Sequence, residues 1–251
     1  MRILPDKNKQ RVLLNIYFKE GKKVLLKTVQ PVLARAEHVM PEDLKHQVRR
    51  LLQPEEVESY IETLWTHTGS TFAQDMIKRI QAKADNAYQL GFWDRIFRRY
   101  AAERSAKIVG RILSTEAENI NRIIDQYVIQ GESEGLGIAE IARNMRDGLA
   151  NDVIGMQNYE AARIAQTEVI GSANRGSFEG AQSTGLELTK TWAHSGNYGP
   201  GYRPEHVAFG ELGDMEMDYE YDTGLQFPGD GNADPGQTIN CRCDIYFNDV
   251  N

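Results

Sequence analysis

Cysteine is scarce in this sequence, with only two among 251 residues. Two cysteines cannot build the disulfide framework by which small secreted domains compensate for a small core. No apolar run approaches the roughly 20 residues that cross a bilayer, and the opening MRILPDKNKQ lacks the apolar segment of a secretory signal. These absences predict a globular protein that is kept or assembled in a reducing cytoplasm.

Several signatures of catalysis and of nucleic-acid reading are also missing. The sequence contains no P-loop, no glycine fingerprint of a dinucleotide-binding fold and no HExxH pair of metal ligands. It has no helix-turn-helix or zinc-finger pattern either. These absences argue against nucleotide-dependent enzymes, HExxH metalloproteases and a dedicated DNA-binding module.

Charge is unevenly distributed along the chain, whose net charge is −7. Residues 1–113 carry 21 Lys and Arg against 13 Asp and Glu, whereas residues 114–251 carry 8 against 23. The basic first half predicts salt-sensitive contact with DNA or a partner, and the alternative is a set of helices with solvated charged faces. The candidate DNA-binding or partner-binding residues are Lys22, Lys23, Lys27, Arg49, Arg50, Arg98 and Arg99.

Residues 1–130 are expected to be mainly helical. Pro41 and Pro54 are each followed by acidic residues, an arrangement typical of helix starts. Residues 92–130 keep an apolar stripe that predicts either one long helix or two. A capping-box pattern favours a break at Ser114–Thr115.

The middle of the chain is rich in glycine. The sequence GESEGLG at 131–137 predicts a turn, after which a short amphipathic helix precedes a longer helix that contains Gly171, Gly176 and Gly180. Because each glycine inside a helix costs about 0.5–1 kcal/mol relative to alanine, the longer helix is expected to pack closely against another backbone or a ligand. Proteases are expected to cut first at 131–137 or between residues 148 and 158.

Three segments near the end alternate in the manner of strands: LELTKTWAHS (186–195), MEMDYEYD (215–222) and INCRCDIYF (239–247). The expected fold class is α+β, with an elongated, mostly helical N-terminal part followed by a small β-rich C-terminal unit packed on the glycine-containing helix. The expected domains are a helical, basic region at 1–130 and an α+β domain at 138–251.

Both cysteines lie in the last of these segments. Strand alternation would place Cys241 and Cys243 on one apolar face, where a reduced cysteine packs as a small hydrophobe. The alternative is a zinc site, in which His206 and His194 would complete a set of four ligands. The sequence leaves both interpretations open, and its expected cofactor is either none or zinc.

A set of polar and aromatic residues in the second half could form a cluster beneath the β-rich unit. Its members are Arg163, Thr167, Glu168, Trp192, Arg203, His206, Asn240 and Arg242. His206 could act as a general base, but no nucleophile stands beside it in the sequence. We therefore expect a structural cluster without catalytic residues. The alternative is a metal-dependent hydrolase or nuclease that uses His206, Glu168 and the cysteine pair.

Residues 157–247 resemble the Mu-F-like family of phage head-morphogenesis proteins. The resemblance rests on Arg163 with Thr167–Glu168 in ARIAQTEVIGSANRG, on a Trp-containing strand (KTWAHSG), on Arg203 with His206 in RPEHVAFGE, and on a closing NCRC at 240–243. The sequence departs from the family where AQTE replaces ARTE and where NYGPGYRPEH replaces an Asp-rich approach to the histidine.

The resemblance implies a non-enzymatic minor capsid protein of a tailed bacteriophage. Such a protein would be portal-associated and would act in head morphogenesis, capsid assembly and DNA packaging or ejection. Its implied partners are the portal protein, the major capsid or scaffolding protein, and DNA without sequence preference, with no membrane partner. Its implied location is the virion, inside the head near the portal, and the host cytoplasm during assembly. Residues 138–251 would form the Mu-F-like domain.

Overall fold

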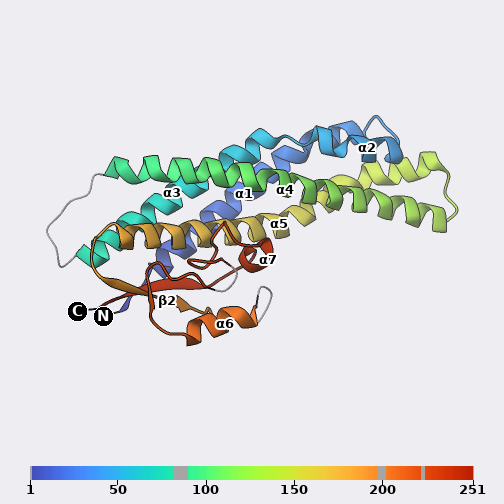
Figure 1. Ribbon diagram of the computed structural model, residues 1–251. Helices are drawn as coiled ribbons and strands as arrows, with labels where there is room; N and C mark the ends of the chain where they lie inside the picture. Colours follow the sequence, from blue (N-terminus) through green and yellow to red (C-terminus); the bar gives the residue numbers. More distant parts are fainter. Residues whose placement is uncertain (1, 82–89, 197–201, 222–223, 251) are drawn as a thin grey trace. The chain divides into compact units, whose positions relative to one another are not determined.

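A computed structural model describes residues 2–81, 90–196, 202–221 and 224–250. The protein is mostly helical and carries a small antiparallel sheet, which confirms the predicted α+β class (Figure 1). The helices are α1 (Lys7–Ala36), α2 (Pro41–Leu51), α3 (Pro54–Gln81), α4 (Leu90–Ser133), α5 (Ile138–Gln182), α6 (Pro204–Glu211) and α7 (Pro235–Thr238). The strands are β1 (Arg2–Ile3), β2 (Leu188–Ala193), β3 (Met215–Glu216) and β4 (Asp244–Asp249).

Proline marks the starts of α2 and α3, as the sequence predicts. Pro41 and Pro54 are the first residues of these helices, and acidic residues occupy both first turns. The first helical position needs no backbone N–H donor, and the negative charges favour the positive end of the helix dipole. Local chemistry therefore determines where these two helices begin.

Helix α4 is continuous through Ser114–Thr115, so the predicted break is wrong. Leu113, Ala117 and Ile120 are buried on successive turns across this position. Burial of a continuous apolar stripe stabilises the helix more than the preference of Ser and Thr for a helix end destabilises it. A capping pattern within such a stripe therefore does not end the helix.

Helix α5 is also continuous, so the separate short helix is wrong, and residues 148–158, where proteases were expected to cut, lie inside it. Leu149 and Val153 are buried within this stretch. Gly148 lies where a Cβ atom would collide with the Tyr127 hydroxyl of α4. This glycine therefore permits close packing of two helices and does not mark a linker.

The chain packs into two compact units, each assembled from separated segments. The first unit comprises Met1–Phe18, Ile61–Arg104 and Arg163–Asn251, and the second comprises Lys19–Tyr60 and Ser105–Ala162. The first unit thus groups the sheet with helical segments from the first half of the chain. The sequence predicts two domains that follow each other along the chain, divided at 131–137, and this grouping is different. The turn predicted at 131–137 is present and connects α4 to α5.

The sheet has the strand order β1-β4-β2-β3, and all of its pairs are antiparallel. Trp192 lies opposite Ile245, and Ile3 lies opposite Phe247. One face of the sheet packs against the ends of α3 and α5 in the first unit. The residues of this core are Met76, Ile80, Phe178, Ala181, Leu188, Phe227, Ile245 and Phe247.

The structure agrees with some of the three predicted strands and differs from others. Strand β2 confirms the strand expected at 186–195. The described part of the segment expected at 215–222 forms the two-residue β3, a turn and an isolated bridge from Tyr221 to Leu225. The segment at 239–247 was predicted as one strand, but β4 begins only at Asp244. Asn240 has a φ of 57°, a left-handed conformation that interrupts an extended strand. Both cysteines therefore precede β4, and they are buried on either side of the exposed Arg242, as the predicted alternation has it.

The glycine-containing part of α5 packs closely against α3, as expected from its composition. A Cβ atom at Gly180 would lie 3.0 Å from the Cα atom of Ala73. A Cβ atom at Gly176 would lie 3.0 Å from the Cβ atom of Phe72. The glycines thus allow two helix backbones to approach each other directly beside the sheet.

Candidate functional site

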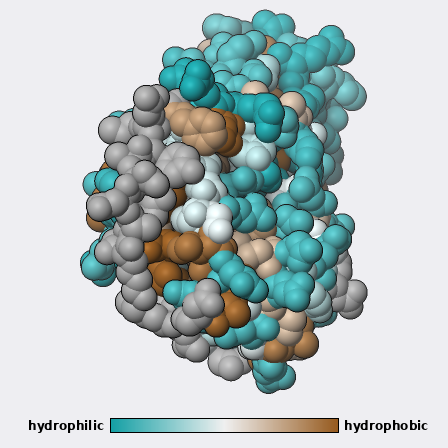
Figure 2. Space-filling model, turned by 60° about the vertical axis from the view of Figure 1, so that its left-hand side comes forward, coloured by the Kyte–Doolittle hydropathy of each residue, from teal (hydrophilic) through white to brown (hydrophobic). Residues whose placement is uncertain are grey.

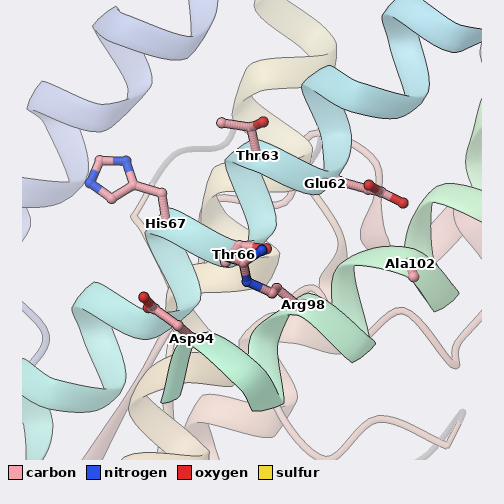
Figure 3. A pocket seen from close by; sticks show the side chains of 7 residues that line it. All are labelled: Glu62, Thr63, Thr66, His67, Asp94, Arg98 and Ala102. Atoms are coloured by element: carbon pink, nitrogen blue, oxygen red, sulfur yellow. The ribbon is translucent and has the colours of Figure 1, made fainter. Parts of the chain in front are cut away.

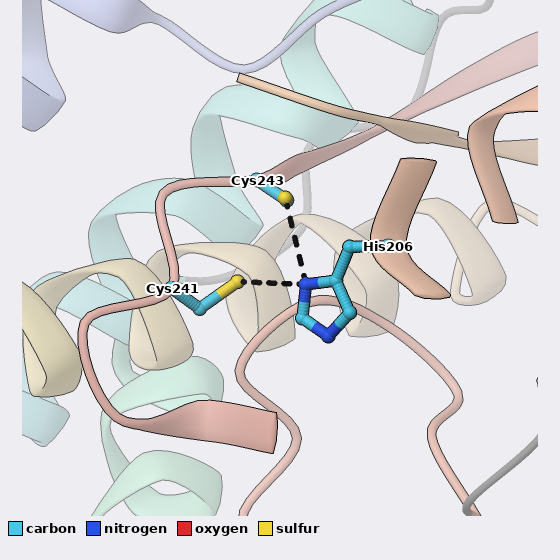
Figure 4. A group of neighbouring side chains, drawn as sticks. All are labelled: His206, Cys241 and Cys243. Carbon is cyan, nitrogen blue, oxygen red and sulfur yellow. Dashed lines mark hydrogen bonds between the residues drawn. The ribbon is translucent and has the colours of Figure 1, made fainter. Parts of the chain in front are cut away.

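His206, Cys241 and Cys243 meet in a buried cluster in the first unit (Figure 4). His206 comes from the first turn of α6, and the two cysteines come from the segment between α7 and β4. The Nδ1 atom of His206 lies 3.7 Å from the Sγ atom of each cysteine. The exposed fractions are 1% for His206, 1% for Cys241 and 3% for Cys243, so bulk water has little access to the three side chains.

The imidazole ring of His206 is fixed on its other side. Its Nε2 atom lies 3.0 Å from the side-chain oxygen of Gln237. An amide oxygen only accepts hydrogen bonds, so Nε2 donates to it, and Nδ1 is the ring nitrogen that faces the two sulfur atoms. The centroid of the Trp192 ring lies 4.8 Å from that of the His206 ring in an edge-on arrangement, and the Phe209 ring stacks on it at a centroid distance of 5.8 Å. The ring is therefore held in one orientation.

Backbone contacts position the segment that carries the cysteines. The Arg203 guanidinium donates to the carbonyl oxygens of Gly236 and Ile239, the latter at 2.7 Å. The backbone N–H of Asn240 donates to the Thr167 hydroxyl at 3.0 Å. These contacts tie both α6 and α5 to the same short turn.

Asn174, also on α5, holds the last residue before β4. Its Nδ2 group donates to the backbone oxygens of Cys243 and Pro228, each at 3.0 Å. Its Oδ1 atom accepts from the backbone N–H of Ile245 at 3.3 Å. A single buried amide thus satisfies three backbone groups around the end of the cysteine segment.

The two thiols differ in their acidity because they share a hydrogen bond. This bond raises the pKa of the Cys241 thiol well above its usual value, and burial acts in the same direction. The same bond lowers the pKa of the Cys243 thiol to about 4, assisted by hydrogen bonding to His206 and to the backbone of Ser195. Cys241 therefore donates its proton toward a Cys243 thiolate.

Glu168 belongs to a different contact network of the first unit. Its carboxylate accepts from the Arg104 guanidinium at 2.7 and 2.8 Å and from the Trp65 indole N–H at 2.8 Å. The side chains of Arg104 and Glu168 are 10% and 5% exposed. This bidentate ion pair joins α3, α4 and α5, and Arg104 and Trp65 were not among the residues singled out from the sequence.

The predicted polar set is therefore only partly assembled. Trp192, Arg203, His206, Thr167 and Asn240 lie in or beside the cysteine site, as the contacts above establish. Three members lie elsewhere. Glu168 pairs with Arg104, and the backbone oxygen of Arg163 accepts a hydrogen bond from the Thr167 hydroxyl. Arg242 is exposed.

His194 does not join the three residues that could hold a metal. Its ring instead lies edge-on to the Tyr202 ring, with 6.1 Å between the two ring centroids. The predicted four-residue zinc set is therefore reduced, among the described residues, to His206, Cys241 and Cys243. Free, buried cysteines were predicted correctly, although both lie before β4 and not within it.

The basic residues predicted to bind DNA or a partner lie at the surface of α1, α2 and α4, with Lys22 half-buried and the others exposed. Lys23 pairs with Glu20 at 2.8 Å, and Lys27 pairs with Glu56. The set divides between the two units, because Arg98 and Arg99 belong to the first and the other five to the second. Some of the positive charge is therefore already balanced by neighbouring carboxylates.

An open polar depression of about 510 Å³ lies between α3 and α4 in the first unit (Figure 3). Its lining residues are Glu62, Thr63, Thr66, His67, Asp94, Arg98 and Ala102. The His67 ring accepts or donates a 2.8 Å hydrogen bond with the Tyr17 hydroxyl. Arg98 also belongs to the predicted binding set. No lining residue belongs to the cysteine site, so the depression and the cysteine site are separate features.

The surface view in Figure 2 is mainly hydrophilic, with separate hydrophobic areas. Exposed apolar side chains of the first unit include Leu4, Leu186, Leu212 and Val250. Among the described helices, none has both the length and the apolar character needed to span a bilayer.

Comparison with protein-family models, curated proteins and solved structures found no match for this chain. The chemistry of the cysteine site and the sequence pattern at 157–247 are therefore the basis on which a function is assigned. Both concern the first unit, where α5, α6 and the segment before β4 meet.

Proposed function

We propose that this protein is a minor head protein of a tailed bacteriophage that associates with the portal and acts in head assembly and DNA packaging or delivery. The supporting observation is that residues carrying the sequence resemblance converge in one packed site. Arg203 and His206 of the Arg-x-x-His element contact the segment that carries NCRC, and Thr167 of the AQTE helix binds its Asn240 N–H. The shared pattern thus corresponds to a set of contacts that stabilise one fold.

The chemistry of these residues favours a structural role over hydrolysis. Both ring nitrogens of His206 are engaged, one with Gln237 and one with the thiols. The carboxylate of Glu168 is occupied by Arg104 and Trp65. A general base needs hydrogen-bond access to its substrate, whereas both groups are buried and already partnered. A hydrolase or nuclease that uses these residues is therefore the less favoured alternative.

The portal is proposed to dock mainly on the helical region at 1–130. Arg49 and Arg50 are exposed near the end of α2 and offer charge that a complementary acidic surface could use. Substituting exposed charges at the edge of an interface changes the rate of association more than it changes the stability of the fold. Arg49 and Arg50 can therefore be substituted without disturbing the core.

The test is co-purification of the full-length protein with the portal protein encoded in the same genome. Arg49→Glu combined with Arg50→Glu should weaken retention, whereas Arg242→Glu, an exposed charge beside the cysteine site, should leave it unchanged. Stronger loss from Arg242→Glu would contradict the docking assignment. Absence of binding to portal, capsid protein and DNA, together with hydrolysis of nucleic acid or peptide, would support the enzymatic alternative instead.

A further inference from the structure

The cysteine cluster has the dimensions of a metal site. In a tetrahedral zinc site, Zn–S bonds of about 2.3 Å and Zn–N bonds of about 2.0–2.1 Å place ligand atoms roughly 3.5–3.8 Å apart. The Nδ1 atom of His206 lies 3.7 Å from each sulfur, and all three ligand atoms lie within 4.8 Å of one another. We propose that His206, Cys241 and Cys243 bind one zinc ion.

The donor set fits zinc in type as well as spacing. Thiolate sulfur and imidazole nitrogen are the ligands that zinc prefers, while Mg²⁺ and Ca²⁺ prefer oxygen. The Nδ1 atom of His206 is the ring nitrogen that faces both sulfurs, because Nε2 donates to the Gln237 side-chain oxygen on the other side of the ring. Metal-binding histidines characteristically donate their second ring N–H to such an oxygen.

Simple packing of two thiols would not require this arrangement. An apolar pocket for cysteine needs only hydrophobic neighbours, whereas here a buried imidazole nitrogen lies 3.7 Å from both sulfurs.

The site is held by contacts that do not depend on an ion. Arg203 fixes the turn through the Ile239 carbonyl oxygen, and Asn174 fixes the backbone of Cys243. An ion at this position would connect α6 to the segment that leads into β4, and thereby to the central strand pair of the sheet. The inferred role is a structural cross-link within the first unit, and it stands independently of the proposed place in a phage head.

The experiment uses full-length protein without a histidine tag, purified under reducing conditions. We expect about one zinc ion per chain by elemental analysis. Exchange for Co²⁺ should give the intense visible absorption of a tetrahedral site and the near-ultraviolet absorption of cobalt bound to thiolate. Wild-type protein that gives neither absorption with added Co²⁺ would overturn the proposal.

Matched variants identify the ligands. Cys241→Ser, Cys243→Ser and His206→Gln should each weaken Co²⁺ binding by at least roughly tenfold, and His194→Gln should leave it unchanged. Unchanged binding in His206→Gln, or loss in His194→Gln, would contradict the assigned ligand set. If the ligand variants fail to fold, Gln237→Ala tests the same geometry from outside the ligand set, with an expected loss of about tenfold or more. Unchanged affinity in that variant would contradict the assigned ring orientation.

Discussion

At the scale of single residues, the contact between Glu168 and Arg104 distinguishes a structural carboxylate from a catalytic one. Three donated hydrogen bonds occupy its two oxygens, and its charge is balanced by a guanidinium that is itself nearly buried. A carboxylate in this state orients helices but is not available to accept a substrate proton. Removing its charge would leave Arg104 buried beside a neutral partner.

Glu168→Gln is expected to lower the free energy of unfolding by roughly 2–4 kcal/mol, because a buried guanidinium loses its counter-charge. Glu179→Gln is the matched control on the same helix. Its ion pair with Arg175 at 3.2 Å is more exposed, and its loss should cost less than about 1 kcal/mol. Chemical denaturation of the three proteins checks this, and equal destabilisation by both substitutions would contradict the distinction.

Residue types and local spacing predicted part of the site but not its partners. Thr167, Trp192, Arg203, His206 and the NCRC segment could be singled out because they form a recognisable pattern. Arg104 and Trp65 could not, because their contacts with Glu168 span 64 and 103 positions of the sequence and depend on tertiary packing.

Lys190 shows the same limit at another position. A lysine within an alternating strand is ordinarily expected on a solvated face, but Lys190 is fully buried and donates to the Tyr219 carbonyl oxygen at 2.6 Å. Burial lowers the pKa of its ammonium group to about 8. Nothing in the local pattern distinguishes this lysine from an exposed one.

At the scale of elements, the glycines of α5 have opposite roles at different positions. A Cβ atom at Gly180 would lie 3.0 Å from the Cα atom of Ala73, whereas a Cβ atom at Gly155 would meet nothing within 4 Å. Both residues are inside the same helix. Their substitution therefore separates the packing contribution of glycine from its backbone flexibility.

Gly180→Ala is expected to destabilise the protein by about 1–3 kcal/mol, because the added methyl group overlaps the backbone of α3. Gly155→Ala should instead stabilise it by about 0.5–1 kcal/mol, because alanine is the better helix former at an open position. Thermal and denaturant unfolding of both variants measure this. The same sign of change in both would mean that the close approach of α3 and α5 is not required.

Element boundaries were predictable where local chemistry determines them. Proline and acidic residues identified the starts of α2 and α3, and alternation identified β2. The break at Ser114–Thr115 and the strand through Cys241 were wrong, since apolar burial continues α4 and the left-handed Asn240 interrupts the extended chain. Local patterns fail where tertiary contacts or one unusual backbone angle decide the outcome.

At the scale of the whole molecule, binding to DNA remains a prediction from the basic first half. If Arg98 and Arg99 contact phosphates, affinity for DNA of unrelated sequences should fall steeply with salt, by about 0.9 logarithmic units per phosphate contact for each tenfold rise in salt. Arg98→Gln with Arg99→Gln should reduce that slope by about 1–2, and Arg242→Gln should leave it unchanged. Fluorescence anisotropy across a salt series measures the slope; sequence-specific or salt-independent binding would contradict phosphate contact.

Composition predicted a boundary near 131–137, but it did not predict which segments pack together. The first unit combines residues 2–18 and 61–104 with the sheet, since α1, α3 and α4 each contribute residues to both units. A long helix shows no change of composition where its packing partner changes. Contacts between distant segments, such as that between Gly180 and Ala73, decide the grouping.

The pairing of β1 with β4 has a consequence for how the chain is made. Ile3 lies opposite Phe247, so β1 cannot pair in the sheet until β4, which lies far downstream of it, has been synthesised. Ribosomal synthesis delivers the helical segments of both units before β4 emerges. Closing so long a loop is slow because its entropy is lost before the strand pairs form. The nascent protein is therefore expected to carry helical segments with an unfinished sheet until β4 has been synthesised.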